Sequence, residues 1–146
     1  MMRQAWCISA ADRMTAAEAL PLYRAAGWIA YTEHPAQLEA ALGSSLCVLE
    51  ARAGGRLIGL LRAVGDGVTI VYIQDILVLP AWRRRGVGRA LIQALRARYS
   101  SVRQIVLLTD DRPETCAFYR SAGFRPAGEW GCAAFAVFGP GPDPSL

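Results

Sequence analysis

The sequence predicts an α/β protein, in which a central mixed sheet carries helices on both faces. Apolar runs of strand length alternate with runs whose apolar residues have helical spacing. Glycines and prolines punctuate these runs at turn positions. At 146 residues, with 53% hydrophobic and 19% charged residues, the chain has the size and composition of one globular domain. The expected order of elements is β-α-α-β-β-β-α-β-α-β.

The N-terminal part predicts one strand and two helices. Residues 4–9 alternate weakly between apolar and polar and are expected to form a strand. Thr15 and Glu18 have the spacing of a capping box, which predicts a helix that ends before Gly27. After an aromatic loop, a second helix is expected over residues 35–42, because a proline suits its first turn.

Three strands are expected in the middle of the chain, over residues 46–53, 56–64 and 68–79. The first two flank a Gly-Gly pair that suits a hairpin turn. Pro80 ends the third strand, because proline cannot donate to the ladder of a sheet.

The C-terminal part predicts two helices and further strands. Apolar residues with helical spacing and arginines on the opposite face predict a helix over residues 84–98. A strand over 104–109 and a helix over 113–121 follow. Residues 133–138 are expected to form a last strand, and a short one is expected near 124–127.

No repeat or change of composition divides the chain, so we expect a single domain over residues 1–139. The Gly-Pro-rich residues 140–146 predict a flexible tail. No apolar run approaches the roughly 18 residues of a membrane span, and no signal peptide is recognisable, so a cytoplasmic protein without membrane contact is expected. The four cysteines are widely spaced and accompany a single histidine. We therefore expect no metal site, and cysteines that are small buried hydrophobic residues.

The basic residues point to a phosphate-bearing ligand rather than to nucleic acid. The net charge is +4, and all sixteen basic residues are arginines, which bind phosphate well. Few arginines outside residues 83–89 form a run, so no nucleic-acid partner is expected.

An arginine-rich turn with two glycines, residues 83–88, lies between the end of a predicted strand and the start of a predicted helix. The first N–H groups of a helix have no intrahelical partner and form an anion site, so this turn suits a pyrophosphate. A Rossmann loop would need a third glycine where Leu91 stands, and a Walker loop would need Gly-Lys-Ser/Thr. An ordinary helix start with surface arginines is the alternative.

The motif over residues 83–88 resembles the Arg/Gln-x-x-Gly-x-Gly/Ala acyl-CoA signature of the GNAT superfamily. Residues 76–80 resemble the bulged fourth strand of that family, and residues 117–124 resemble its Phe-Tyr-x-x-x-Gly-Phe motif. The resemblance implies a GNAT-like fold and an N-acetyltransferase that moves an acetyl group from acetyl-CoA to a primary amine by direct attack in a ternary complex. The amine acceptor would be a small molecule or a peptide. It also makes a homodimer possible. Arg112 stands where many members have asparagine.

The resemblance also implies a set of cosubstrate contacts. Backbone groups of Leu77 and Val78 would pair with the pantetheine arm, amides from Arg84 to Arg89 would hold the pyrophosphate, and Tyr119 would stand near the sulfur. The complete set is Ile76, Leu77, Val78, Arg83, Arg84, Arg85, Gly86, Val87, Gly88 and Arg89.

Aminolysis of a thioester calls for a base, an oxyanion donor and a proton for the thiolate. Tyr119 is the candidate proton donor, with packing between helix and sheet as the alternative. Asp75 is either a catalytic base or a carboxylate that is hydrogen-bonded structurally. A free N–H at a strand bulge near Val78 would bind the oxyanion.

Four residues are candidates for contact with the acceptor: Trp28, Tyr31, Tyr72 and Gln74. Strand alternation places Tyr72 and Gln74 on one face and Asp75 on the other, unless a bulge intervenes. Trp28 and Tyr31 could equally belong to the core; if they line a pocket, they favour a flat or aromatic amine. A protein that binds acyl-CoA as a sensor without catalysis is the alternative function.

Overall fold

The computed structural model describes residues 5–139 of the chain. Its elements are β1 (Cys7–Ala10), α1 (Ala16–Ala25), α2 (Ile29–Thr32), α3 (Pro35–Gly43), β2 (Cys47–Ala53), β3 (Arg56–Gly65), β4 (Ile70–Val78), the 3-10 turn η1 (Pro80–Trp82), α4 (Val87–Arg98), β5 (Gln104–Leu107), α5 (Pro113–Ser121) and the 3-10 turn η2 (Ala127–Trp130). The chain divides into two compact units, Met1–Leu107 and Leu108–Leu146, and each is described by itself.

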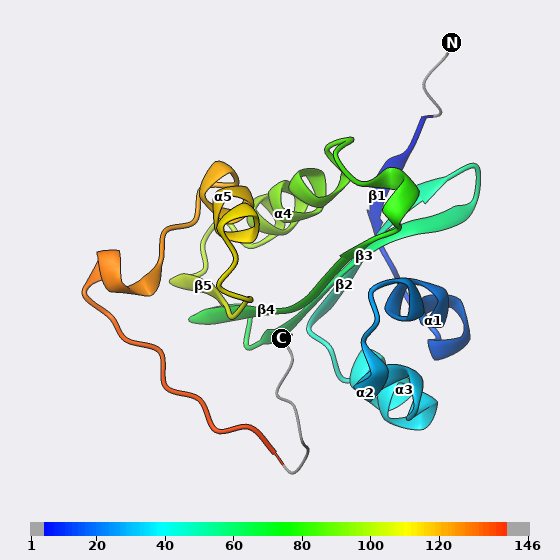
Figure 1. Cartoon of the computed structure of the whole chain (residues 1–146), viewed down its shortest axis with the longest axis horizontal. Coiled ribbons are helices and arrows are strands. Elements are labelled where there is room, and N and C mark those ends of the chain that lie inside the picture. The colour runs from blue at the N-terminus through cyan, green and yellow to red at the C-terminus, as the bar shows by residue number, and fades with distance from the viewer. Residues whose placement is uncertain (1–4, 140–146) are drawn as a thin grey trace. The chain divides into compact units, whose positions relative to one another are not determined.

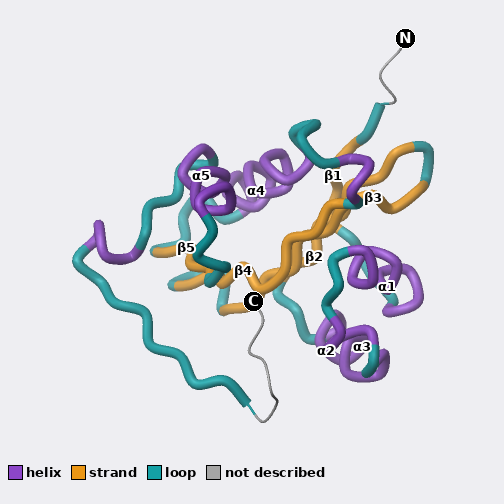
Figure 2. Tube along the Cα trace, viewed as in Figure 1, coloured by secondary structure: helices purple, strands orange, loops and turns teal. Residues whose placement is uncertain are grey.

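The first unit contains a five-stranded sheet in the order β1-β2-β3-β4-β5. Its neighbours pair antiparallel except β4 and β5, which are parallel, so the mixed sheet is confirmed. Helices α1, α2 and α3 lie on one side of this sheet and α4 lies on the other (Figures 1 and 2). The expected first strand starts at Cys7, and Gln4 lies outside the described residues.

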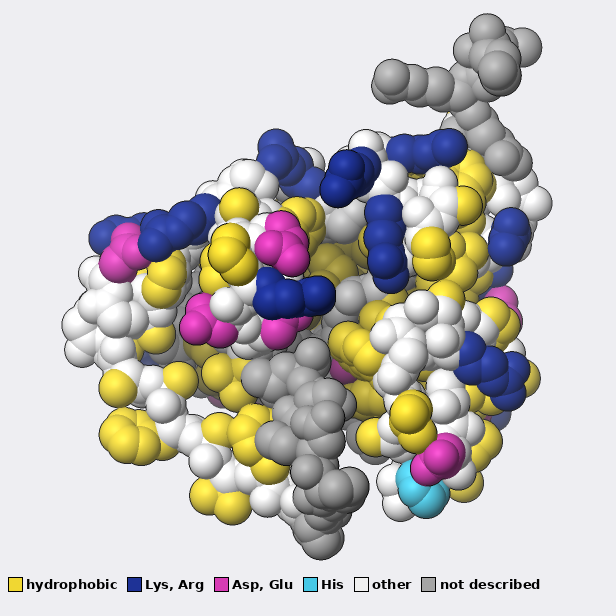
Figure 3. Space-filling view, in the orientation of Figure 1, with side chains coloured by type: hydrophobic (Ala, Val, Ile, Leu, Met, Phe, Trp, Pro, Cys, Tyr) yellow, Lys and Arg dark blue, Asp and Glu magenta, His cyan; other side chains and the backbone are white. Residues whose placement is uncertain are grey.

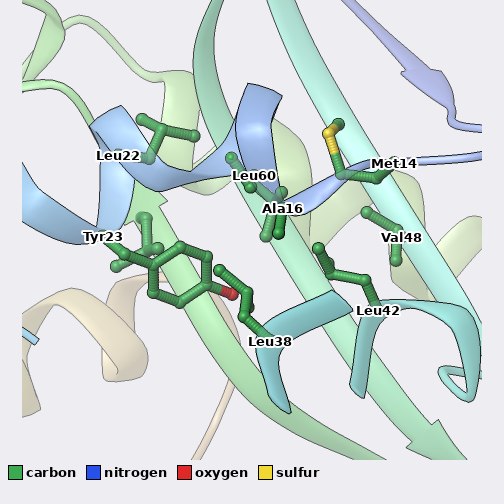
Figure 4. Packing of buried hydrophobic residues seen from close by; sticks show 10 residues of the cluster. Met14, Ala16, Leu22, Tyr23, Leu38, Leu42, Val48 and Leu60 are labelled. Atoms are coloured by element: carbon green, nitrogen blue, oxygen red, sulfur yellow. The ribbon is translucent and has the colours of Figure 1, made fainter. Parts of the chain in front are cut away.

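The layer of α1 and α3 packs on the sheet through a core of buried aliphatic side chains and one tyrosine. Thr15 caps α1 as predicted, since its hydroxyl accepts from the Glu18 amide at 3.2 Å. Leu22 and Tyr23 of α1 and Leu38 of α3 are almost completely buried. Figure 4 shows these side chains packed together with Val48 and Leu60 from the strands. Burial of Tyr23 brings its hydroxyl into the interior, where it needs a partner.

Helix α4 covers the opposite face and begins directly above a glycine of β3. A Cβ added to Gly59 would lie 3.1 Å from Val87 Cγ1 and 3.2 Å from the Leu77 carbonyl oxygen. Only a residue without a side chain allows the first residue of α4 to approach the sheet this closely. Val87, Leu91, Ile92 and Leu95 are the buried residues of the helix.

Several expectations about elements were wrong. The aromatic loop contains the short helix α2, and α4 begins at Val87 instead of residue 84 because η1 and a turn precede it. Residues 124–127 and 133–138 form no strand in the described part of the chain, and η2 begins at Ala127, the last residue of the first of these segments. Apolar alternation predicts a strand, but a strand also needs an edge with which to pair.

The cysteines were also predicted incorrectly. Cys47 is buried as expected, whereas Cys7 and Cys132 are exposed and Cys116 is partly exposed. In the second unit, α5 has the predicted bounds, and Gly123 follows it with a φ of 96°. The predicted tail over residues 140–146 lies outside the described residues. The single domain stays a prediction.

Candidate functional site

Strand β4 contains a bulge at Gln74. On β3, Arg62 pairs with Asp75 and the next residue, Ala63, pairs with Ile73, so Gln74 has no opposite residue. The sequence placed the bulge near Val78, four residues further along, and this position was wrong. Val78 instead pairs regularly with Gly59.

The bulge turns Asp75 toward the layer of α1–α3. Directly opposite residues of an antiparallel pair point to the same face. Ile73 pairs with Ala63 and shares its face, whereas Asp75 pairs with Arg62 and points to the other face. Without the extra residue, Ile73 and Asp75 would point to the same face, because they are two residues apart. The prediction that Gln74 and Asp75 point to opposite faces of the sheet assumed a strand without a bulge, and the bulge at Gln74 breaks that alternation.

Four side chains form a buried cluster behind the bulge, which we call the Asp75 cluster: Tyr23, Tyr31, Arg62 and Asp75. One Asp75 carboxylate oxygen, Oδ2, accepts from the Tyr23 hydroxyl and from Arg62 Nε, each at 2.7 Å. The other, Oδ1, accepts from the Tyr31 hydroxyl at 3.2 Å. Arg62 also donates to the Tyr31 hydroxyl at 3.2 Å. Asp75 is 1% exposed and Arg62 is 6% exposed, so the two charges are paired away from water.

The electrostatics of this cluster keep both phenols neutral. Burial raises the pKa of Tyr23, and the Asp75 carboxylate raises it further, because a phenolate beside a carboxylate would be a pair of like charges. Burial and Asp75 also raise the pKa of Tyr31, while hydrogen bonds from Arg62 and Gln74 act in the opposite direction. Both hydroxyls therefore remain donors at neutral pH.

Aromatic rings extend the Asp75 cluster toward the surface of the α1–α3 layer. Trp28 stacks on Tyr31 with ring centroids 6.0 Å apart, and Tyr31 lies 4.8 Å from Tyr23. Trp28 and Tyr31 are partly buried and pack against the core. Gln74 is exposed and Tyr72 is partly buried. Trp28 and Tyr31 therefore pack against the core, and each also keeps part of its surface exposed, as contact with an acceptor requires.

The same strand offers an open edge beyond its bulge. Pairing of β4 with β5 ends at Ile73, which lies opposite Leu107. From Asp75 to Val78, β4 pairs with β3 on one side, and from Gln74 onward no strand of the described first unit pairs on the other. Backbone groups on that side of Ile76, Leu77 or Val78 can accept an extended ligand as an added strand.

The loop before α4 has an unusual backbone. Among the described residues other than glycine, Arg84 alone has a positive φ, of 60°. Gly86, two residues later, has a φ of 85°. A Cβ at Gly86 would meet no atom within 4 Å, so the space beside this backbone is open. Helical bonding starts with the Ala90 amide, which donates to the Gly86 carbonyl, so the amides of Val87 and Gly88 have no acceptor within the helix.

Arginine side chains surround this loop at the surface. Arg83 Nε donates to the Val78 carbonyl oxygen at 3.3 Å, and the Arg85 guanidinium lies 5.0 Å from the centre of the Trp82 ring. Arg83, Arg84, Arg85 and Arg89 are all exposed. Positive charge, open space and unpaired helix amides together make an anion site. The residues present therefore fit a pyrophosphate group.

Tyr119 lies on α5, in the second unit. Burial raises the pKa of its phenol to about 12, although a hydrogen bond with Thr109 acts in the opposite direction. The phenol is therefore protonated at neutral pH. Cys116 lies on the same helix and is partly exposed, with its sulfur 3.9 Å from an Asp111 carboxylate oxygen.

Two negative findings apply to residues 5–139. They contain no group of three or more His, Cys, Asp or Glu side chains that could hold a metal ion. Among these residues, no helix has the length and apolar character needed to cross a membrane.

Comparisons with known proteins give a consistent family. A family model described as "Acetyltransferase (GNAT) domain" matches residues 43–126. A solved structure of a GNAT-family acetyltransferase from Streptococcus pneumoniae TIGR4 is 31% identical, with a TM-score of 0.84 over 92% of this chain and 98% of that one. The structure of AAC(6')-Iy in complex with the bisubstrate analogue CoA-S-monomethyl-acetylneamine has the same fold, with 21% identity and a TM-score of 0.68 over 94% and 98% of the two chains.

A curated relative, serotonin N-acetyltransferase 2, chloroplastic, from Oryza sativa subsp. japonica, is 36% identical over 74 residues, which are 49% of this chain. The aligned parts cover 36% and 50% of the length of the first two curated relatives, so this chain spans half or less of each.

Proposed function

The chain belongs to the GNAT acetyltransferase family, and from this premise we propose that it transfers an acetyl group from acetyl-CoA to a primary amine by direct attack in a ternary complex. The observation that carries the proposal is the continuity of two features: the open edge of β4 over Gln74–Val78 and the anion site at the start of α4, which η1 joins to it. A pantetheine arm and its pyrophosphate need such a pair of adjacent sites.

The anion site explains how the chain would hold the diphosphate. The amides of Val87 and Gly88 would donate to phosphate oxygens, and Gly86 leaves open the space through which they approach. Arg83, Arg84, Arg85 and Arg89 would add positive charge around it. Because these side chains are exposed, their contribution to affinity should fall as salt concentration rises.

Along β4, the open edge would position the thioester. Backbone groups of Ile76, Leu77 and Val78 would pair with the amides of the pantetheine arm. Arg83 donates to the Val78 carbonyl, so this contact would have to yield if that carbonyl pairs with the arm. A bulge disturbs the regular ladder, so an N–H near Gln74 replaces one near Val78 as our candidate donor to the oxyanion.

We assign Asp75 a positioning role instead of proton abstraction. Both of its carboxylate oxygens already accept hydrogen bonds, and Arg62 neutralises it. An acceptor amine with a pKa near ~10.4 would reach the site mostly protonated, with about one molecule in 2,500 neutral at pH 7. Without a protein base, kcat/KM should rise about tenfold per pH unit from pH 7 to pH 9.

Tyr119 is our proposed partner of the leaving sulfur. A thiol has a pKa of ~8.5, whereas the pKa of Tyr119 is about 12, so complete proton transfer to the thiolate would be uphill. The phenol would therefore stabilise the thiolate chiefly as a hydrogen-bond donor. We expect Tyr119→Phe to lower kcat by roughly 10-fold to 100-fold with little change in the affinity for CoA, since a charge-assisted hydrogen bond contributes about 1.5–3 kcal/mol. A change below about threefold would assign Tyr119 to packing.

The acceptor side favours an aromatic amine over a polycation. Trp28, Tyr31 and Tyr72 offer ring surface, and the carboxylate of Asp75 is already paired. The relative named as a serotonin N-acetyltransferase supports the same choice, whereas AAC(6')-Iy was solved with an analogue that contains acetylneamine.

A thiol-release assay with acetyl-CoA would test the proposal. We would compare an arylalkylamine, a polyamine and an aminoglycoside, and expect the arylalkylamine to have the highest kcat/KM. In parallel, CoA should raise the melting temperature, and the rise should grow as the CoA concentration increasingly exceeds the dissociation constant. Stabilisation by CoA without turnover of any amine would favour an acyl-CoA sensor, and no stabilisation at millimolar CoA would contradict the cosubstrate assignment.

A further inference from the structure

Gln74 is one residue more than the pairing of β3 and β4 requires. Before it, Ile73 lies opposite Ala63, and after it, Asp75 lies opposite Arg62. Because Arg62 and Ala63 are consecutive, a β4 strand without Gln74 would pair with β3 without interruption, and its other side chains would keep their faces. The pairing therefore explains neither the presence of the extra residue nor its position.

The apolar side chains of β4 do not fix where the extra residue lies. A Cβ on Gly59 would lie 3.1 Å from Val87 of α4, so this face of the sheet is turned to α4. Leu61 and Ala63 share it, because side chains alternate along β3. Leu77 of β4 belongs to the opposite core, under α1 and α3. Since both layers accept apolar side chains, a register shift of one residue only exchanges one apolar side chain for another, and the extra residue can move along the strand.

Asp75 limits this movement toward the end of β4. If the extra residue moved to Ile76, Asp75 would lie opposite Leu61 on the α4 face, away from Arg62. Leu61 is 0% exposed and Arg62 is 6% exposed, so each charge would lose its counter-charge in a buried position. Uncompensated buried charges are strongly unfavourable, and this register is therefore excluded.

Gln74 itself limits the movement in the other direction. If the extra residue moved to Tyr72, Gln74 would lie opposite Ala63 and face α4, at a position that is 0% exposed. A buried amide would need a hydrogen-bond partner there, whereas the side chain is exposed in its present place. Two polar residues thus bracket the bulge.

The Arg62–Asp75 pair is unusual in its burial. Charged side chains lie at the surface on the face of the molecule that Figure 3 shows, whereas Arg62 and Asp75 are 6% and 1% exposed. Hydroxyls of Tyr23 and Tyr31 also donate to Asp75, so α1, α2 and β3 all hold its carboxylate on one face of β4. A buried ion pair adds little stability compared with apolar residues, but it can specify one register among several.

We propose that the Arg62–Asp75 pair holds the bulge at Gln74 and thereby positions the backbone N–H that would bind the oxyanion. Arg62 acts through the strand and is a positioning residue. The catalytic consequence rests on the proposed function, whereas the position of the bulge does not. Movement of the bulge by two residues would displace its backbone by about 7 Å, and an oxyanion donor has to lie within about 3 Å of the oxygen.

Deletion of Gln74 tests whether this residue is extra to the fold. We expect the deletion variant to be nearly as stable as the wild-type chain, because every pair between β3 and β4 is kept. Its kcat should fall by roughly 100-fold to 1,000-fold, the usual cost of one oxyanion donor, while the affinity for CoA changes by less than about threefold. A deletion variant that unfolds, or whose kcat stays within about threefold, would overturn the proposal.

Deletion of Ile76 is the matched control, because it shortens the same strand by a residue that is paired. Either Asp75 would lose Arg62, or the residues that follow would turn to the other face. We expect this control to lose most of its stability in urea denaturation. Equal losses of stability in the two deletion variants would overturn the proposal.

Replacement of the charged pair tests what holds the bulge in place. The apolar variant combines Arg62→Met, Asp75→Leu and Tyr23→Phe, so that no buried charge remains and no Tyr23 hydroxyl is left without its acceptor. Interstrand NMR contacts report the register: Leu61 contacts Ile76 when the bulge has its present position, and position 75 when the bulge has moved by two residues. We expect only the first contact in the wild-type chain and both contacts in the apolar variant.

The same three substitutions in the Gln74 deletion variant provide the control. No extra residue can move there, so a single register should remain. A single register in the apolar variant that retains Gln74 would show that the pair does not hold the bulge, and two registers in the deletion background would show a general loss of order in the sheet. Either result would overturn the proposal.

Folding of the apolar variants is informative in itself. If only the variant that retains Gln74 fails to fold, the extra residue cannot be accommodated without the pair, which supports the proposal. If both fail, the pair is needed for the whole fold and its specific role at the bulge is overturned. The NMR contacts and the stabilities need no substrate, so a wild-type chain without turnover would contradict the proposed function and leave the test of the bulge intact.

Discussion

The loop that begins α4 and the Asp75 cluster both depend on arginine, but they use its charge in opposite ways. In the loop, Arg83, Arg84 and Arg85 are exposed, and the open space beside Gly86 can receive an anion. In the cluster, Arg62 is buried against a carboxylate that three donors already satisfy. The loop is arranged to bind a ligand charge, whereas the cluster has no free charge to offer.

This difference indicates separate tasks for the two regions. A buried pair holds its partners in one geometry, because losing either member leaves an uncompensated charge. Asp75 holds the hydroxyls of Tyr23 and Tyr31 and thereby fixes the orientation of Tyr31, one of the residues proposed to contact the acceptor. Changes in the cluster should therefore act mainly on stability, and changes in the loop should act mainly on CoA affinity.

The largest effect expected is that of Asp75→Ala. The substitution leaves the buried Arg62 guanidinium without its carboxylate, which should lower the free energy of unfolding by about 3–5 kcal/mol. Urea denaturation would measure this loss. Asp110→Ala is the control, because Asp110 pairs with the exposed Arg112 and should cost less than about 1 kcal/mol. If Asp75→Asn keeps wild-type stability but abolishes turnover, Asp75 is a catalytic base and our positioning role is wrong.

Tyr23→Phe should have the next largest effect, and it should depend on pH. Loss of the hydrogen bond to a charged group should cost about 1.5–3 kcal/mol near neutral pH. Folding raises the pKa of Tyr23 above the value of ~10 in the unfolded chain, so its contribution is complete below pH 10 and declines as the pH rises further. Wild-type stability should therefore fall above pH 10, and the Tyr23→Phe variant should show a shallower fall. Equal slopes in urea titrations of the two proteins would contradict the raised pKa.

The loop before α4 could be predicted from the sequence far better than the Asp75 cluster. The reason is how far apart along the chain the residues of each lie. The loop occupies residues 80–89, so its motif can be read directly from neighbouring residues. The cluster joins residues up to 52 positions apart, from α1, α2, β3 and β4. Its formation depends on the bulge at Gln74, and a bulge of one ordinary residue leaves no mark in the hydrophobic pattern.

The remaining errors in the fold have related causes. Residues 133–138 have the pattern of a strand, but pairing depends on an edge that the pattern cannot specify. Helix α4 was expected from residue 84 because the apolar spacing cannot reveal that Arg84 and Gly86 adopt left-handed conformations. Helix α5 was predicted with its correct bounds, since Pro113 and Gly123 punctuate both of its ends locally.

Gly86→Val should lower the affinity for CoA by more than its effect on stability explains. Any L-residue is strained at a φ of 85°, by about 1–2 kcal/mol, and the valine side chain would occupy the space beside the helix amides. We expect the dissociation constant for CoA to rise by about 10-fold to 100-fold, which calorimetry would measure.

The chain offers a closely matched control for this variant. Gly55 has a φ of 81°, and a Cβ there would also meet nothing within 4 Å, but it lies in the hairpin between β2 and β3. Gly55→Val should therefore cost similar stability and leave CoA affinity unchanged. Equal losses of affinity in the two variants would show that strain, and not obstruction of the anion site, explains the effect of Gly86→Val.

The smallest effect expected separates charge from conformation at Arg84. The left-handed backbone of Arg84, with a φ of 60°, costs about 1–2 kcal/mol in strain. Arg84→Ala would keep this strain, and Arg84→Gly would remove it. Glycine also lowers stability by about 0.5–1 kcal/mol because it frees the unfolded chain, so the Gly variant should be more stable than the Ala variant by at most about 1.5 kcal/mol. Both variants lose the same exposed guanidinium, so CoA affinity should fall equally in both, by a few-fold at low salt and less at high salt. A Gly variant that loses much more affinity than the Ala variant would show that the left-handed backbone itself, and not the charge of Arg84, shapes the anion site.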